Sequence, residues 1–159
     1  MFLTGKGKAA HLRIGRNGED AAKRLFLDMG CDFLARDLRL PGGEMDLVFR
    51  DGRTLVFIEV KSRRIKRKEE ASFVNPADAL RPDQKKRIYR ASRQYLREIG
   101  DPALPYRYDL VEVIFLAGYG LYMMRHHKAA FGSRSLYGAF TGNGGASFAA
   151  GREDVPLYF

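Results

Sequence analysis

The sequence predicts an α/β fold with one core, and three observations support this class. The 159 residues, 45% of them hydrophobic, are enough for one ordinary domain. Two stretches place apolar residues at helical spacing. Several others are rich in β-branched and aromatic residues and lie between turn sequences. In chain order these patterns predict a helix, three strands, a second helix and two more strands.

A stripe of small and apolar residues predicts the first helix. Gly30 comes directly after the stripe and would end the helix. Residues 1–11, ahead of the stripe, are expected to form a flexible N-terminus. The members of the stripe, at helical spacing, are Ile14, Gly18, Ala22, Leu25 and Met29.

A β-hairpin around Asp51-Gly52 is the central structural prediction. This dipeptide is a strong signal for a two-residue hairpin turn, and it lies between the predicted strands 44–50 and 54–61. A shorter strand over residues 33–40 precedes the hairpin. The turn sequence Pro41-Gly42-Gly43 ends that strand.

The segments after the hairpin complete the predicted fold. After Lys61 the run SRRIKRKEE is charged, has no period that would bury it, and predicts a solvated loop or flap. Residues 83–99 place apolar side chains on one helical face and basic side chains on the opposite one, which predicts the second helix. Residues 106–116 and 121–127 predict the last two strands.

The domain is expected to span residues 12–131. Residues 132–159 are rich in glycine and serine and are expected to be a disordered tail, although the terminal VPLYF could add to a sheet edge. The N-terminal stretch lacks the apolar run of a signal peptide, and no segment approaches the ~20 apolar residues that span a bilayer. We therefore expect a soluble, cytoplasmic protein without a membrane partner.

The charge of the chain points to a polyanionic partner. Lys and Arg number 28 against 19 Asp and Glu, which gives a net charge of +9 and a pI of about 9.8. Nucleic acid is the first expectation and acidic lipid the second. The flap and the start of the second helix are the expected phosphate contacts, with a merely solubilising face as the alternative. These residues are Arg63, Arg64, Lys66, Arg67, Lys68 and Lys85.

Other polar residues carry weaker signals. The single cysteine, Cys31, excludes an internal disulfide and a cysteine-based zinc site built from one chain, so we expect it to be small apolar filler. His126 and His127 are adjacent in a predicted strand and therefore point to opposite faces, which favours structural roles. Arg107 and Asp109 share a face, where a local charge pair and a functional role are equally open.

The hairpin register determines which side chains share a face. With Asp51-Gly52 as the loop, Asp46 pairs with Phe57. Glu59 then lies diagonal to Asp46 on the same face, at a backbone separation of about 7–8 Å. Lys61 lies two residues beyond Glu59 and shares this face. The opposite face is expected to be part of the core and carries Met45, Leu47, Phe49, Val56, Ile58 and Val60.

Asp46, Glu59 and Lys61 form a candidate catalytic site for metal-dependent phosphodiester cleavage. Two carboxylates can hold Mg²⁺, which prefers oxygen ligands and keeps waters that can serve as the nucleophile. A lysine beside them can stabilise the charge that develops on the phosphate. The alternative is an exposed hairpin face whose charged side chains are solvated or weakly paired. An aspartate followed later by E-x-K also occurs often by chance.

Five segments of the chain match a known pattern in order: GRNGEDAA (15–22), RDLRLPGGEMDLV (36–48), FIEVKSR (57–63), KKRI (85–88) and YRYDLVEV (106–113). Together they resemble the YraN-like family of uncharacterised bacterial proteins, and the resemblance covers residues 12–131. That family is identified as a member of the PD-(D/E)xK, restriction-endonuclease-like superfamily and is similar to archaeal Holliday-junction resolvases. The resemblance implies a restriction-endonuclease-like mixed β-sheet flanked by helices.

The resemblance also implies roles for four residues. Asp46 takes the place of the superfamily's metal-binding aspartate. Glu59 and Lys61 take the place of its E-x-K, with Glu59 as a metal ligand. Glu19 matches the helical glutamate that resolvase-like members add as a further metal ligand. On the predicted helix Glu19 lies about 60° from Ala22, at the edge of the buried face, and its alternative role is to favour the helix N-terminus through the macrodipole.

The function that the resemblance implies is that of an endonuclease-like protein using Mg²⁺ or Mn²⁺. Such a protein binds DNA, branched or otherwise structured DNA included, and cleaves its phosphodiesters. A symmetric junction as substrate would favour a homodimer. Two alternatives stay open: a non-catalytic nucleic-acid-binding module that retains the nuclease fold, and a metal-poor scaffold whose charge serves RNA or anionic lipid.

Overall fold

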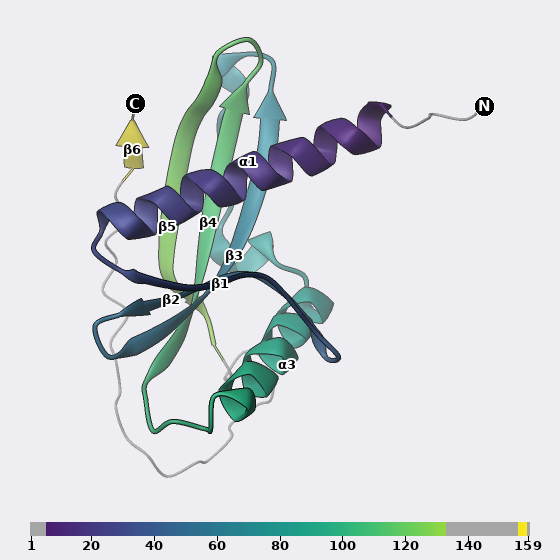
Figure 1. Ribbon diagram of the computed structural model, residues 1–159. Coiled ribbons are helices and arrows are strands. Elements are labelled where there is room, and N and C mark those ends of the chain that lie inside the picture. Colours follow the sequence, from purple (N-terminus) through teal and green to yellow (C-terminus); the bar gives the residue numbers. More distant parts are fainter. Residues whose placement is uncertain (1–5, 133–155, 159) are drawn as a thin grey trace, which may run out of the picture.

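The computed structural model describes residues 6–132 and 156–158, which form one β-sheet with a helix on each face (Figure 1). The predicted α/β class is confirmed. The helices are α1 (Lys6–Asp28), the short α2 (Pro76–Ala79), α3 (Pro82–Glu98) and the 3₁₀ helix η1 (Lys68–Glu70). The strands are β1 (Asp32–Leu40), β2 (Gly43–Asp51), β3 (Thr54–Ile65), β4 (Tyr106–Leu116), β5 (Gly120–Phe131) and β6 (Pro156–Tyr158). None of the helices in the described ranges combines the length and the apolar character that a bilayer crossing requires.

The strands of the sheet follow the order of the chain, from β1 to β6. The pair β3–β4 is parallel, and the other neighbouring pairs are antiparallel. A parallel pair needs a crossover connection, which η1, α2 and α3 provide here. The sheet is therefore mixed and has helices on both faces, as the resemblance implied.

The central turns of α1 pack across one face of the sheet because their inner residues are small or apolar. Ala22 and Phe26 are completely buried there against apolar side chains of β2, β3 and β4. At Gly18 the helix approaches β3 so closely that an added Cβ would lie 1.7 Å from the Ser62 Oγ. Gly18 therefore sets the distance between α1 and the sheet. Cys31 is buried in the same cluster, as expected for apolar filler.

The start of α1 and the burial of Met29 differ from the prediction. The helix already begins at Lys6, so the expected flexible N-terminus is wrong for Lys6–His11, while residues 1–5 lie outside the described residues. At the other end, Met29 follows the last helical residue and is exposed, so it does not belong to the buried stripe. Gly30 ends the helix as predicted, with a φ of +80° that favours glycine.

α3 covers the opposite face of the sheet. Its apolar side packs on β2, β3 and β4, and the basic side predicted for this helix is exposed. The turn between β1 and β2 lies against α3, where an added Cβ on Gly43 would lie 2.4 Å from the Arg87 carbonyl oxygen. The glycine therefore lets the backbones of β2 and α3 touch. The buried residues of α3 are Ile88, Ala91, Ser92 and Leu96.

The predicted β2–β3 hairpin is present, but its turn differs from the prediction. Asp51 pairs with Thr54, so the two turn residues are Gly52 and Arg53. Gly52 has a φ of +58° at the first turn position, as in a type II′ turn. The predicted loop Asp51-Gly52 therefore starts one residue too early.

The corrected register moves each cross-strand partner by two residues. Phe57 pairs with Val48 instead of Asp46. Because side chains alternate with a period of two, a shift of two leaves every side chain on its predicted face. Met45 is an exception, because it was expected on the face opposite Asp46, with Leu47 and Phe49. β2 stops pairing with β3 at Leu47, and Met45, which precedes this point, packs in the cluster on the α3 side instead.

β3 is longer than predicted. The charged segment after Lys61 was expected to be a flap, but Ser62–Ile65 continue the strand in parallel pairing with β4. Ile65 is buried beside Ile114 and Leu116, which explains why this polar stretch stays on the sheet. The loop that leaves β3 therefore begins four residues later than expected.

The C-terminal region is described only in part. Pro156–Tyr158 pair with Met123–Arg125 of β5 as strand β6, so the expected disorder does not hold for these three residues. Residues 133–155 and 159 of the predicted tail lie outside the described residues.

Replacing Gly43 by alanine is expected to lower the free energy of unfolding by roughly 1–3 kcal/mol, because the added Cβ would collide with the Arg87 carbonyl and push α3 from β2. Gly15→Ala in α1 is the matched control, since no described residue outside the neighbouring helix backbone lies within 4 Å of the added Cβ, and alanine favours the helix. Denaturant unfolding measures both variants. Equal stabilities would show that the close approach imposes no constraint.

Candidate functional site

Asp46 lies where β2 separates from β3. The β2–β3 pairing ends at Leu47, and beyond it the Val60 N–H donates to the Asp46 Oδ2 at 2.7 Å. The carboxylate thus takes the place of a backbone carbonyl as the acceptor for this strand N–H. Asp46 lines two clefts, a large one on the α1 side and a small one on the α3 side.

Glu59 and Lys61 lie beside Asp46 on β3. Glu59 lines the small cleft together with Asp46, and its side chain is only 14% exposed. The Lys61 Nζ lies 3.0 Å from the Glu59 Oε1. Gln84 and Arg87 of α3 line the other side of the cleft. The structure therefore brings together the three residues of the predicted catalytic site, although the hairpin register differs from the prediction.

The surroundings of Asp46 disturb the ionisation of its carboxyl group. Burial, followed by the negative charge of Glu59, raises the pKa of Asp46 to about 8. The Val60 hydrogen bond and the Lys61 ammonium group oppose this rise in pKa, while Glu19 adds to it. Ionised Asp46 is therefore unfavourable in the bare protein, and a cation bound between the two carboxylates would stabilise its charged form.

Glu19 approaches the site from α1. It lines the large cleft with Asp46, and burial raises its pKa as well. Its largely buried place agrees with the predicted position at the edge of the packed helix face. Arg36 of β1 donates to the Glu19 Oε2 at 3.0 Å and to the Asp20 Oδ1 at 2.6 Å. The sequence prediction missed Arg36, whose only signal was its place in the RDLRLPGG segment.

The three carboxylates leave oxygen atoms that could bind a metal ion. Asp46, Glu59 and Glu19 each use one oxygen in a contact with the protein, and the second oxygen has no partner within residues 6–132 and 156–158. Nowhere in those ranges do three His, Cys, Asp or Glu side chains gather closely enough to enclose a metal. Mg²⁺ usually takes one or two carboxylates and completes its shell with water and substrate oxygens. Asp46 and Glu59 fit that requirement.

The basic residues predicted to contact phosphate are partly engaged within the protein. Arg63 donates to the backbone carbonyls of Glu70 and Ser72 and thereby holds the loop after β3. Arg67 also contacts Glu70, with its Nε 3.3 Å from the Oε1. Lys85 is half-buried. Phosphate contact by all six residues stays a prediction. Within residues 6–132 and 156–158, the exposed members that form no ion pair are Arg64, Lys66 and Lys68.

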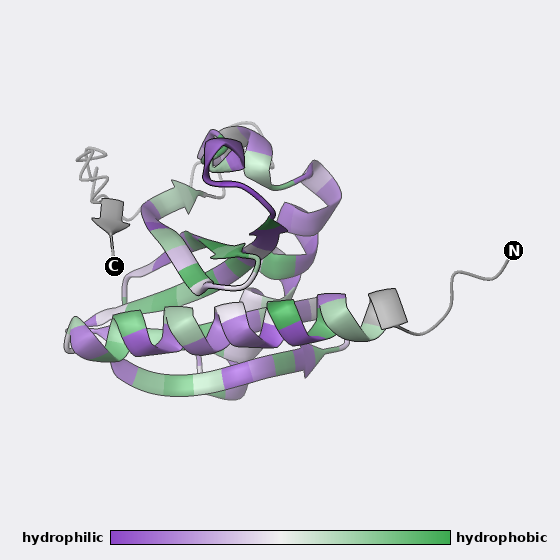
Figure 2. Cartoon of the chain, turned by 90° about the horizontal axis from the view of Figure 1, so that it is seen from above, coloured by the Kyte–Doolittle hydropathy of each residue, from purple (hydrophilic) through white to green (hydrophobic). Residues whose placement is uncertain are grey.

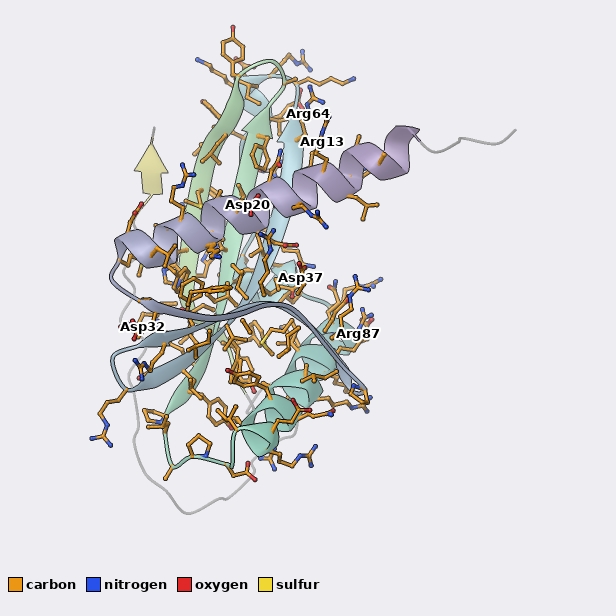
Figure 3. All side chains as sticks on the ribbon, in the orientation of Figure 1. Arg13, Asp20, Asp32, Asp37, Arg64 and Arg87 are labelled. Carbon is orange, nitrogen blue, oxygen red and sulfur yellow. The ribbon has the colours of Figure 1, made fainter. Side chains whose placement is uncertain are left out.

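The large cleft, of about 700 Å³, contains cations that the sequence prediction missed. Arg13 and Arg16 line it from α1, and Arg39 lines it from β1. In Figure 3 the labelled Arg13 projects from the part of α1 that lies toward the N-terminus. Residues 6–11 lack apolar residues at helical spacing, so the sequence did not predict that the helix extends over them. Without this extension, the helix face that carries Arg13 and Arg16 could not be recognised.

Two histidine–carboxylate pairs lie outside this site, and His127 with Glu112 is the fully buried one. The His126 Nε2 lies 2.8 Å from the Asp109 Oδ2 on the α1 side of the sheet. The His127 Nε2 lies 2.7 Å from the Glu112 Oε2. The adjacent histidines thus have structural partners, as predicted. The local charge pair of Asp109 with Arg107 is also present, at 3.1 Å.

The part of the chain that carries the site matches a known family. Residues 18–113 match the Uncharacterised protein family UPF0102. The chain belongs to the UPF0102 family. The matched region contains the four proposed site residues Glu19, Asp46, Glu59 and Lys61. The family resemblance inferred from the motifs is therefore confirmed.

Several UPF0102 proteins are similar to this chain over most of their length. A UPF0102 protein of Symbiobacterium thermophilum is 38% identical over 101 residues, which cover 64% of this chain and 81% of the relative. One from Nocardia farcinica is 36% identical over 118 residues, covering 74% and 88% of the two chains. One from Parafrankia sp. is 36% identical over 119 residues, covering 75% and 96%.

Replacing Asp46 by asparagine is expected to stabilise this UPF0102 protein at pH 8 in the absence of metal. The raised pKa means that the folded state holds a proton on Asp46 more tightly than the unfolded chain does. Stability from this residue is therefore full below its ordinary pKa of 3.8 and is lost as the pH rises to about 8. Asparagine keeps the Val60 hydrogen bond and cannot ionise.

Thermal unfolding across pH 4–8 measures this effect of Asp46→Asn. We expect a midpoint roughly 2–8 °C above wild type at pH 8, and no difference near pH 4. Asp32→Asn, at an exposed carboxylate paired with Arg50, is the control and should not show a gain that grows with pH. A lower midpoint for Asp46→Asn at pH 8 would contradict the assigned pKa.

Replacing Glu112 by alanine is expected to destabilise the protein by roughly 2–4 kcal/mol. Glu112 is buried, accepts the Val74 N–H at 3.1 Å and contacts His127, so its loss leaves buried polar groups without this acceptor. Glu98→Ala, at an exposed residue bonded to Gln94, should change stability by less than about 0.5 kcal/mol. Chemical denaturation measures the free energy of unfolding of both variants. Similar losses of free energy in the two variants would refute the structural role of Glu112.

Proposed function

We propose that this protein is a Mg²⁺-dependent endonuclease-like protein that binds DNA and hydrolyses its phosphodiester bonds. The observation that carries the proposal is the meeting of Asp46 and Glu59 in one cleft, with the Lys61 Nζ 3.0 Å from Glu59. The mixed sheet between two helices supports it, because this is the architecture expected for a restriction-endonuclease-like fold. Membership of the UPF0102 family is consistent with the proposal and does not itself supply an activity.

Each residue of the site has a distinct task in this proposal. Asp46 and Glu59 hold Mg²⁺ or Mn²⁺ through their remaining carboxylate oxygens. A bound metal ion polarises the phosphate and lowers the pKa of a bound water. The Val60 N–H fixes the orientation of the Asp46 carboxylate. The Lys61 ammonium group stabilises the negative charge that develops as the water attacks the phosphate.

Glu19 is proposed as a further ligand on the α1 side of the metal, once its side chain moves closer to Asp46 and Glu59 than it lies in this structure. Its charge already acts on Asp46, and one of its oxygens is held by Arg36. Arg36 therefore acts as a positioning residue that keeps the Glu19 carboxylate over the large cleft. It also offsets the negative charge of Glu19 and Asp20, with which it forms ion pairs at 3.0 and 2.6 Å.

DNA is the proposed partner because the chain carries an excess of nine positive charges and exposed basic residues at the end of β3 and in the segment after it. The predicted phosphate contacts at Arg64, Lys66 and Lys68 belong to this proposal. Branched or otherwise structured DNA is proposed as the substrate on the strength of the resemblance to junction resolvases. Two protomers acting on one symmetric junction would then form a homodimer.

A non-catalytic nucleic-acid-binding module is the second candidate function. The observation that favours it is the engagement of charged site residues within the protein: Lys61 contacts Glu59, and Arg36 contacts Glu19. In this case the fold and the basic surface would serve binding alone. Binding of DNA without cleavage under every metal condition distinguishes it from the nuclease.

Cleavage assays with metal ions test the nuclease directly. The purified protein is incubated with Mg²⁺ or Mn²⁺ and with linear duplex, single-stranded or four-way-junction DNA. We expect cleavage, and a rate lower by roughly 100-fold or more in Asp46→Asn, because half of the metal-binding pair is lost. Lys61→Met should be similarly impaired. Lys86→Met, which removes an exposed lysine of α3, is the matched control and should retain the wild-type rate.

Two outcomes of these assays would count against the proposal. Cleavage that persists unchanged in Asp46→Asn would mean that another site or a contaminant is responsible. Tight DNA binding without cleavage by wild type, with either metal and every substrate form, would favour the binding module.

A further inference from the structure

The outer half of α1 extends past the rest of the fold. Figures 1 and 2, at right angles to each other, both show its N-terminal end projecting beyond the sheet. We define the overhang as Lys6–Asn17, the part of α1 before its close contact with β3 at Gly18. Among its residues with described side chains, 9–17, none is buried. The apolar packing of the helix begins only at Ala21.

The overhang is therefore not held in place by a core of its own. Helices in globular proteins owe most of their stability to burying an apolar face, and short helical segments without such burial are marginal in water. The overhang also contains Gly7 and Gly15, which disfavour a helix. It continues α1 into solvent without contributing to the hydrophobic core. The overhang therefore leaves most of its surface open to solvent and to the large cleft.

The surface that the overhang presents to the large cleft is cationic. Arg13, Arg16 and Glu19 follow at intervals of three residues and all line the cleft, as residues on one helix face do. Arg39 lines the cleft from β1. Within the described part of the chain, none of the guanidinium groups of Arg13, Arg16 and Arg39 forms an ion pair or a hydrogen bond.

The charges along the cleft are arranged in two zones. The carboxylates of Glu19 and Asp46 lie toward the sheet, and the free arginines of α1 lie in the turns before Glu19. A metal at the carboxylates would bind one phosphate of a nucleic-acid backbone, and the neighbouring phosphates need cations beside it. Arginine suits this task, because its planar guanidinium group matches phosphate oxygens in pairs. A membrane surface fits less well, since the arginines line a cleft rather than a flat face.

We propose that the overhang is a nucleic-acid-binding element, in which Arg13 and Arg16, with Arg39 across the cleft, hold the backbone phosphates next to the one at Asp46. This inference deepens the proposed function and rests on it for one point: that a phosphate of the DNA backbone lies at Asp46. Binding itself is independent of catalysis. The element adds contacts to those predicted at Arg64, Lys66 and Lys68.

Equilibrium binding tests the overhang without requiring turnover. A fluorescein-labelled four-way-junction DNA is titrated with the full-length protein in Ca²⁺ or EDTA, and anisotropy is recorded at several salt concentrations. For Arg13→Gln with Arg16→Gln we expect the Kd to rise at least tenfold. The slope of log K against log salt should fall by about 2, because each phosphate contact contributes about 0.9.

The matched control removes two positive charges elsewhere. Arg24 and Arg53 are exposed and line neither cleft, so Arg24→Gln with Arg53→Gln changes the net charge equally. This control should keep the Kd within about threefold of wild type. Equal losses in the two double variants would overturn the proposal, because net charge alone would then explain the binding. Unchanged binding by the overhang variant would overturn it as well.

A cross-linking experiment locates the DNA along α1. Leu12 on the overhang is 69% exposed and Leu27 at the other end of the helix is 48% exposed, so each can carry a cysteine with a photoactivatable group. Cross-links to DNA from Leu12→Cys and none from Leu27→Cys are expected. The reverse result would refute the element. Absence of cleavage by every variant, combined with overhang-dependent binding, would refute the proposed catalysis and leave this inference standing.

Discussion

The hydrogen bond from the Val60 N–H to the Asp46 carboxylate is the contact on which the arrangement of the molecule depends. A strand N–H is normally satisfied by a carbonyl of the neighbouring strand. Here β2 stops pairing with β3 at Leu47, and a side chain supplies the acceptor. The first half of β2 can then follow β1 away from β3 (Figure 1), which leaves a cleft on each side of Asp46. The Asp46 side chain thus satisfies a backbone N–H of the sheet at the point where the two strands separate and the candidate site lies.

The same residue carries the least compensated charge of the site. Glu59 has Lys61 at 3.0 Å and Glu19 has Arg36 at 3.0 Å, whereas the one donor to Asp46 among the described residues is the neutral Val60 N–H. A buried carboxylate without a cation is costly, and natural proteins keep such groups mainly where function requires them. The electrostatics therefore single out Asp46 independently of any motif. Close packing of α1 and α3, which glycines permit, holds both clefts around it.

The sequence allowed the faces of the hairpin to be predicted, because side-chain direction has a period of two and survives a two-residue error in register. The register itself could not be predicted, since Asp51-Gly52 and Gly52-Arg53 are both acceptable two-residue turns. The extension of β3 over Ser62–Ile65 depends on β4 lying alongside, which no local pattern reveals. The overhang and Arg36 were not predicted because the role of a polar residue depends on which residues lie beside it in the folded chain. The roles of the site residues rested on motif and resemblance.

The central place of β3 in the sheet has a consequence for the order of folding. Asp46 and Glu59 belong to one hairpin, so they can approach as soon as its two-residue turn forms. The wall that α3 contributes forms later, because this helix must fold back across residues 66–81 to pack on β1 and β2. Under the proposed function, a newly synthesised chain would therefore form the metal-binding pair Asp46 and Glu59 before the cleft beside it was complete. The proposed metal site and the proposed substrate cleft would then form at different steps of folding.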